Sequence, residues 1–159
     1  MKTMCFDIID DVLVTVHTNE VPHDESWVKY AEAIRRWLAD AKELSRLRNI
    51  VFTDGGAPNS SQRRIVNEIL AGRPPIPAAV VSNSALARGV ITALSWFNPK
   101  IKAFAPDEVI DAYHYLGFTS SQIQVLTPRL AQLQSQMGAP IRAMKGALQG
   151  APSLSLEHR

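Results

Sequence analysis

Cysteine is almost absent from this chain, which has Cys5 alone among its 159 residues. A single cysteine excludes an internal disulfide framework and any zinc site that needs several thiolates. An excess of one charge is also missing, because 17 Lys and Arg stand against 15 Asp and Glu and leave a net charge of +2. So small an excess does not indicate a nucleic-acid-binding or membrane-surface protein.

Long hydrophobic runs are missing as well, since no apolar stretch approaches the roughly 20 residues that cross a bilayer. The N-terminus carries Asp7, Asp10 and Asp11 where a signal peptide needs an uninterrupted apolar segment. We therefore expect no membrane span and a cytoplasmic location. The 46% of apolar residues, in a length typical of one domain, is typical of a folded globular protein.

The apolar patterns predict strands that alternate with helices after an initial hairpin. Two β-branched runs, residues 5–9 and 12–16, flank a turn at Asp10-Asp11 and predict that hairpin. The remaining predicted elements are strands at 49–54, 78–82 and 100–105 and helices at 27–47, 60–72, 83–97, 108–117 and 120–137. The order ββαβαβαβαα predicts an α/β fold, with a mainly parallel sheet of about five strands and the antiparallel hairpin at its N-terminus.

Two of these helices have apolar stripes at three- and four-residue spacing, which predicts buried faces. In helix 27–47 the stripe is Trp27, Ala31, Ile34, Leu38, Ala41 and Leu44, with Trp37 beside it. In helix 83–97 the residues expected inside are Leu86, Val90, Ile91, Leu94 and Phe97, with Trp96 as a further packing residue.

Periodicity ends after residue 137, and the remaining segment is rich in Gly, Ala, Pro and Ser. Such a composition is typical of a flexible tail. We therefore predict a single domain over residues 1–137, and a tail over residues 138–159 that is dispensable for folding.

The first candidate site lies between the predicted strand 49–54 and the helix that follows it. Asp54 ends the strand, at the position where open α/β sheets place ligands. Gly55 and Gly56 permit positive φ and a close approach of other backbone, so we expect at least one of them to have positive φ. Neither glycine-rich nucleotide-binding motif is present.

The same helix begins with a capping pattern, since Asn59 is followed three residues later by Gln62. Ser60 and Ser61 then lie in the first turn, where free N–H groups favour an anion and the Arg63-Arg64 pair adds positive charge. The alternative is structural: the glycines shape a tight turn, Asn59 caps the helix, and the arginines pair with nearby acids.

A second polar turn, Ser82-Asn83-Ser84, follows the next strand. Ordinary helix capping explains it, but Asn83 and Ser84 would join the first turn at one rim if the sheet brings the two turns together. These two turns are the only convergent polar site that the sequence suggests.

Catalytic and metal-binding combinations are poor. His17, His23 and His114 fall in different elements without the spacing of metal ligands. Cys5 lies in a strand, where a buried and inert thiol is expected, and Asp54 has no evident partner as a base. We therefore expect no cofactor, no metal and no catalytic residue.

The order of elements over roughly residues 4–117 resembles the STAS domain, the fold of bacterial anti-sigma factor antagonists. The resemblance rests on the initial β-pair, the repeated βα units and the Ser-containing helix start after the third strand. It implies a turn whose Ser or Thr is phosphorylated by a partner kinase, with Ser60 and Ser61 as the equivalents by position. The family's usual acidic-Ser-Ser or Ser-Gly turn is replaced here by residues 54–61, and the helix after Gly117 is additional.

Three functions remain open on these observations. The first is a non-catalytic interaction or regulatory module that contacts a protein partner through residues 54–64. The second is a binding protein, or an enzyme, that takes an anionic small molecule or phosphoryl ligand at the same helix N-terminus. The third is a structural subunit that assembles through helix 27–47.

Overall fold

The computed structural model describes residues 2–94 and 98–149. It contains one sheet in the spatial order β1-β2-β3-β4-β5. The strands are β1 (Met4–Ile9), β2 (Val12–His17), β3 (Arg48–Thr53), β4 (Ala78–Ser82) and β5 (Ile101–Phe104). β1 pairs with β2 in antiparallel register, and every other neighbouring pair is parallel. The predicted α/β fold with an N-terminal hairpin is therefore confirmed.

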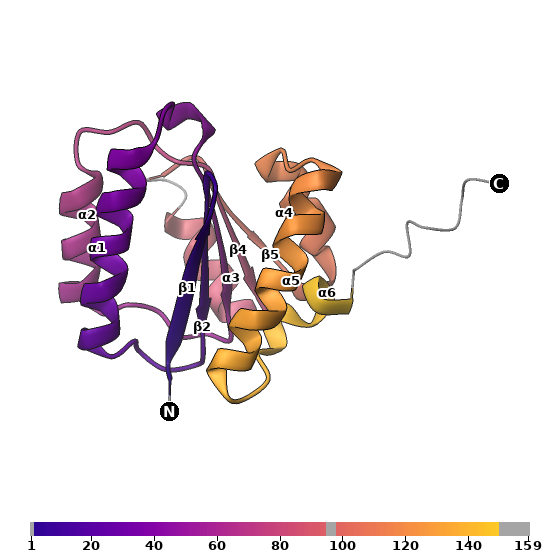
Figure 1. Ribbon diagram of the computed structural model, residues 1–159. Helices are drawn as coiled ribbons and strands as arrows, with labels where there is room; N and C mark the ends of the chain where they lie inside the picture. The colour runs from indigo at the N-terminus through magenta and orange to yellow at the C-terminus, as the bar shows by residue number, and fades with distance from the viewer. Residues whose placement is uncertain (1, 95–97, 150–159) are drawn as a thin grey trace.

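Helices cover both faces of the sheet (Figure 1). α1 (Asp24–Asp40) and α2 (Ser60–Leu70) lie on one face, whereas α4 (Val109–Leu116), α5 (Ser120–Met137) and α6 (Lys145–Gln149) lie on the other. α3 (Ala85–Leu94) packs against β4 and β5. Three short 3-10 turns complete the described elements: η1 (Leu44–Arg46), η2 (Pro106–Glu108) and η3 (Arg142–Met144).

The sheet separates two apolar cores because alternate side chains of β2 point to opposite faces. Val14 and Val16 pack with the α4–α6 layer, while Leu13 packs with α1 and α2. All six residues of β2 are buried, so this strand is covered on both faces as its composition predicts.

The first long helix is shorter than predicted, because α1 ends at Asp40 and Ala41 has an extended backbone with ψ 124°. The stripe from Trp27 to Leu38 is buried as expected. Leu44 is 40% exposed, so its predicted place in the stripe is wrong. The chain leaves the helix at Ala41 and turns back, which buries Leu47 just before β3.

The prediction that Leu86 is buried is also wrong, because its side chain is 81% exposed. Leu86 lies in the first turn of α3, only four residues after β4 ends. The helical period identifies the apolar face of a helix, but it does not tell whether the sheet covers the first turn of that face. Trp96 and Phe97 lie outside the described residues, as do the side chains of Val90 and Leu94.

The predicted flexible tail is wrong for residues 138–149, which contain η3 and α6 and the buried Ile141 before them. Ile141, Ala143, Met144 and Ala147 are buried in the core between the sheet and α5. These apolar residues fill fewer than three helical turns, so their period does not stand out among Gly, Ala and Pro. The remainder of the predicted tail, residues 150–159, lies outside the described residues.

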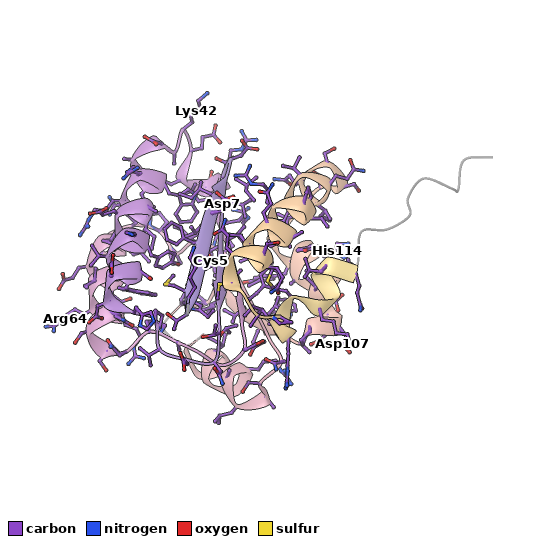
Figure 2. All side chains as sticks on the ribbon, turned by 60° about the horizontal axis from the view of Figure 1, so that its bottom comes forward. Cys5, Asp7, Lys42, Arg64, Asp107 and His114 are labelled. Atoms are coloured by element: carbon purple, nitrogen blue, oxygen red, sulfur yellow. The ribbon has the colours of Figure 1, made fainter. Side chains whose placement is uncertain are left out.

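The edge strand β1 is held to α5 by an ion pair. Arg129 Nη2 and Nε lie 2.7 Å and 2.8 Å from Asp7 Oδ2, a contact between residues 122 positions apart. Cys5, two residues before Asp7 on the same strand (Figure 2), donates a weak hydrogen bond from Sγ to the carbonyl oxygen of Leu133. Both contacts therefore fix the last long helix against the first strand.

No helix in residues 2–94 and 98–149 is both long and apolar enough to cross a membrane.

Candidate functional site

The turn after β3 is built around two glycines that play different parts. Gly55 has φ +115°, which confirms the prediction of a positive φ in this pair. The Thr53 hydroxyl accepts from Gly55 N at 3.1 Å and donates to Gly56 O at 2.7 Å. The side chain of Thr53, the last residue of β3, thus stabilises the turn that follows it.

Gly56 is required because the turn after β3 packs directly against the backbone of the loop after β2. Its N–H donates to Thr18 O at 2.8 Å, and a Cβ at this position would lie 2.4 Å from Thr18 O and 2.3 Å from Glu20 O. No side chain fits in that space, so the turn after β3 lies directly against the loop after β2.

Asp54 is not a free base. Its two carboxylate oxygens accept from the backbone N–H groups of Arg142 and Ala143 at 3.0 Å and 2.9 Å. Asp54 therefore ties the sheet to the C-terminal segment. No local pattern indicates this role, because both partners lie almost 90 positions away in the segment predicted as a tail.

The predicted capping box at the start of α2 is confirmed. Asn59 Oδ1 accepts from Gln62 N at 2.9 Å, and Gln62 Oε1 accepts from Asn59 N at 3.0 Å. Gln62 is also only 2% exposed, and its Nε2 donates to Pro22 O and Asp24 Oδ1. The indole of Trp27 donates to Gln62 O at 2.8 Å, so the start of α2 is fixed to the start of α1.

Ser60 and Ser61 are both exposed in the first turn of α2. The Arg63 guanidinium donates to Ser60 Oγ at 3.2 Å and to Pro58 O at 3.1 Å. Arg64 points away from the body of the protein (Figure 2) and makes no ion pair within the described part of the chain. The structure therefore brings Arg63, but not Arg64, to Ser60.

The two predicted turns do lie side by side, since a Cβ on Gly55 would be 3.9 Å from Ser84 Cβ. Ser84 acts mainly as a helix cap, with its Oγ accepting from Ala87 N at 3.2 Å. Asn83 is exposed and, together with Asp54, lines a cavity at this edge of the sheet.

The polar groups with the most altered titration lie inside the protein. His17 ends β2, is almost fully buried, and its Nδ1 has no hydrogen-bond partner among the residues that the structure describes. Burial lowers the pKa of His17 to about 4 and raises the pKa of the Cys5 thiol to about 11. A neutral imidazole and a protonated thiol are the expected forms at neutral pH.

The burial of His17 predicts a loss of stability in acid. Its folded pKa of about 4 lies below the ordinary histidine pKa of 6.5, so the unfolded chain binds more protons between these values and stability falls as the pH drops through this window. We expect the free energy of unfolding to lose about 2 kcal/mol between pH 7 and pH 5 through this group. Urea denaturation at both pH values measures it.

His17→Gln should remove that part of the pH dependence, whatever its effect on stability at pH 7. His114→Gln, at an exposed position on α4 (Figure 2), is the matched control and should retain it. An unchanged pH dependence in His17→Gln contradicts the assignment.

No group of three His, Cys, Asp or Glu side chains among the described residues is arranged to hold a metal ion. Comparison with known proteins gives no match to a family model, to a curated protein or to a solved structure.

Proposed function

We propose that this chain is a non-catalytic, STAS-like interaction module that regulates a protein partner. Its contact surface is the α2 rim, which we define as the exposed residues Gly55, Ser60, Ser61, Arg63 and Arg64. The observation that carries the proposal is the exposed Ser60 hydroxyl, which accepts from Arg63 at the N-terminus of a firmly anchored helix.

The chemistry of the α2 rim suits an acidic partner. Two arginines and the positive end of the α2 dipole lie together, and neither arginine has an ion pair within the described ranges. Asp54, which follows β3 at the start of this turn, is directed to backbone N–H groups of the C-terminal segment. A partner that presents carboxylates would therefore meet uncompensated positive charge.

Phosphorylation of Ser60 would neutralise most of that positive charge. A phosphate carries about −1.5 to −2 charges, and it would be stabilised here by the helix N-terminus and the Arg63 guanidinium. Within the described ranges Ser61 makes no side-chain hydrogen bond to an arginine, so we propose Ser60 as the principal phosphoacceptor. The folded domain accommodates the group, while an acidic partner loses the positive charge that attracts it.

The anchoring of α2 supports a preformed surface. Gln62 is buried and bonded to Pro22, Asp24 and Trp27, which places the first turn without a partner present. A preformed surface loses little conformational entropy on binding. A chain with a single cysteine needs no oxidising compartment to fold, which supports a reducing, cytoplasmic location for such a module.

The strand order favours a surface over a ligand crevice. Ligand crevices in open α/β sheets form where the order of strands reverses and the connections diverge. The order β1-β2-β3-β4-β5 never reverses. We therefore prefer a protein partner to a phosphoryl ligand at the start of α2.

Phosphomimetic variants test the proposal. The full chain is immobilised as Ser60→Asp/Ser61→Asp, as Ser60→Ala/Ser61→Ala and unchanged, and proteins retained from a lysate of the source organism are quantified. A partner of the α2 rim should lose about tenfold in affinity for the Asp variant and bind the Ala variant normally. The Asp variant should fold as the parent does, since acidic groups are favourable at a helix N-terminus.

A nearly identical sequence provides the control. Residues 119–122 repeat the cap, the two serines and the glutamine at the start of α5, with the same reciprocal hydrogen bonds. Ser120→Asp/Ser121→Asp makes the same change of charge at an exposed helix start outside the α2 rim. A partner lost equally from both Asp variants, or retained by both, contradicts the assignment to α2.

A further inference from the structure

The strongest unassigned feature is a cavity of about 360 Å³ at the edge where β2, β3 and β4 end. Its size falls within the range of about 300–1,000 Å³ that is usual for ligand pockets. The walls come from the N-terminus, the loop after β2, the turns after β3 and β4, and the segment before η3. The C-terminal segment thus supplies a wall that the strand order alone does not provide.

Five exposed polar side chains line this cavity without a hydrogen bond or ion pair to any other described residue. They are Lys2, Asn19, Glu20, Asn83 and Arg142, and none makes a hydrogen bond or ion pair with another residue of the described ranges. Two other polar residues of the lining are occupied. Asp54 accepts from two backbone N–H groups, and the Thr18 hydroxyl donates to Thr3 O and accepts from Glu20 N.

The charged side chains at this cavity that make no ion pair with a described residue are of both signs, and this combination favours a ligand that also carries both charges. Lys2 and Arg142 offer two cations, of which Arg142 suits the planar geometry of a carboxylate. Glu20 offers a carboxylate, which disfavours a purely anionic ligand and favours one that also carries an ammonium group. The amides of Asn19 and Asn83 add neutral donors and acceptors.

We propose that this cavity binds a small zwitterion of the amino-acid class. Its carboxylate is held by Lys2 and Arg142, and its ammonium group by Glu20. The site is separate from the α2 rim, because Ser60, Ser61, Arg63 and Arg64 do not line it. The binding of a zwitterion at the cavity and the binding of a protein partner at the α2 rim can therefore be tested, and can fail, independently.

Backbone amide resonances of the ¹⁵N-labelled full chain report on this site directly. The probes are the proteinogenic L-amino acids, each added singly, with sodium acetate and sodium phosphate as anions alone and methylammonium as a cation alone. We expect at least one amino acid to shift the amides of Asn19, Glu20 and Asn83 saturably, with a Kd of about 1 mM or lower. Acetate, phosphate and methylammonium should bind at least about tenfold more weakly.

Charge-neutral variants complete the test. Arg142→Gln and Glu20→Gln should each weaken the binding of that amino acid by about tenfold, while Arg36→Gln, at an exposed arginine of α1 away from the cavity, leaves its affinity unchanged. All three positions are exposed, so the melting temperature should stay that of the parent. The proposal is overturned if no amino acid shifts these amides, if phosphate or acetate binds as tightly as the best amino acid, or if Glu20→Gln binds it normally.

Discussion

Ending the chain after Ala139 is expected to destabilise the protein by about 5 kcal/mol or more, which is comparable to the whole stability of many domains. The deletion removes Ile141 and Met144, two buried apolar side chains worth about 1.5–3 kcal/mol each. It also removes η3 and α6 from β3, β4, α5 and η2, against which they pack, and leaves Asp54 without its two N–H donors. Thermal and urea denaturation followed by circular dichroism should show a lost or strongly lowered transition.

The reference for that experiment is the chain ended after Gln149, which retains every buried residue named above. Met144→Ala in the full chain isolates one contribution and should cost about 2–5 kcal/mol. If the chain ended after Ala139 has the same melting temperature as the reference, residues 140–149 do not contribute to the core. The prediction of a dispensable tail then holds.

Gly56→Ala is expected to cost about 3 kcal/mol, an unusually large effect for adding one methyl group. The new Cβ would lie 2.3 Å from Glu20 O and 2.4 Å from Thr18 O. Both are backbone atoms, so the clash is relieved only by moving the loop after β2 or the turn after β3. That movement also breaks the hydrogen bond from Gly56 N to Thr18 O. The free energy of unfolding in urea measures the cost.

Two other glycines separate this clash from the loss of glycine itself. Gly55→Ala has room but places alanine at φ +115°, and should cost about 1–2 kcal/mol. Gly89→Ala lies in α3 with nothing near the new Cβ, and should be neutral or stabilising by about 0.5–1 kcal/mol. Equal losses of stability in Gly55→Ala and Gly56→Ala would show that the close backbone approach at Gly56 adds nothing to the cost.

Local patterns were sufficient to predict most of the fold. The hairpin follows from two β-branched runs around Asp10, and the capping box at Asn59 and Gln62 involves only residues three apart. Such signals depend on neighbours in the sequence, so a single sequence contains them. The alternation of strands with helices then leaves a mainly parallel sheet as the natural architecture.

The errors concern which surface an element meets in three dimensions. The helical period predicts buried positions for Leu86 and Leu44, but Leu86 is exposed in the first turn of α3 and Leu44 lies beyond the end of α1. The opposite error was made for Met144, whose short helix has too few turns to show a period. At the site, the roles of Asp54 and Gln62 depend on contacts with residues between 35 and 89 positions away. No local pattern contains such contacts.

The attachment of α5 to β1 sets an order of events during synthesis. Arg129 leaves the ribosome 122 residues after Asp7, which at typical rates of translation is roughly ten seconds later. During that time the hairpin lacks the helix that covers one of its faces, and β1 is an open edge that other chains can pair with. A carboxylate in the middle of such an edge discourages pairing. Asp7 therefore serves twice, first as a charge that protects the nascent hairpin and later as the anchor for Arg129.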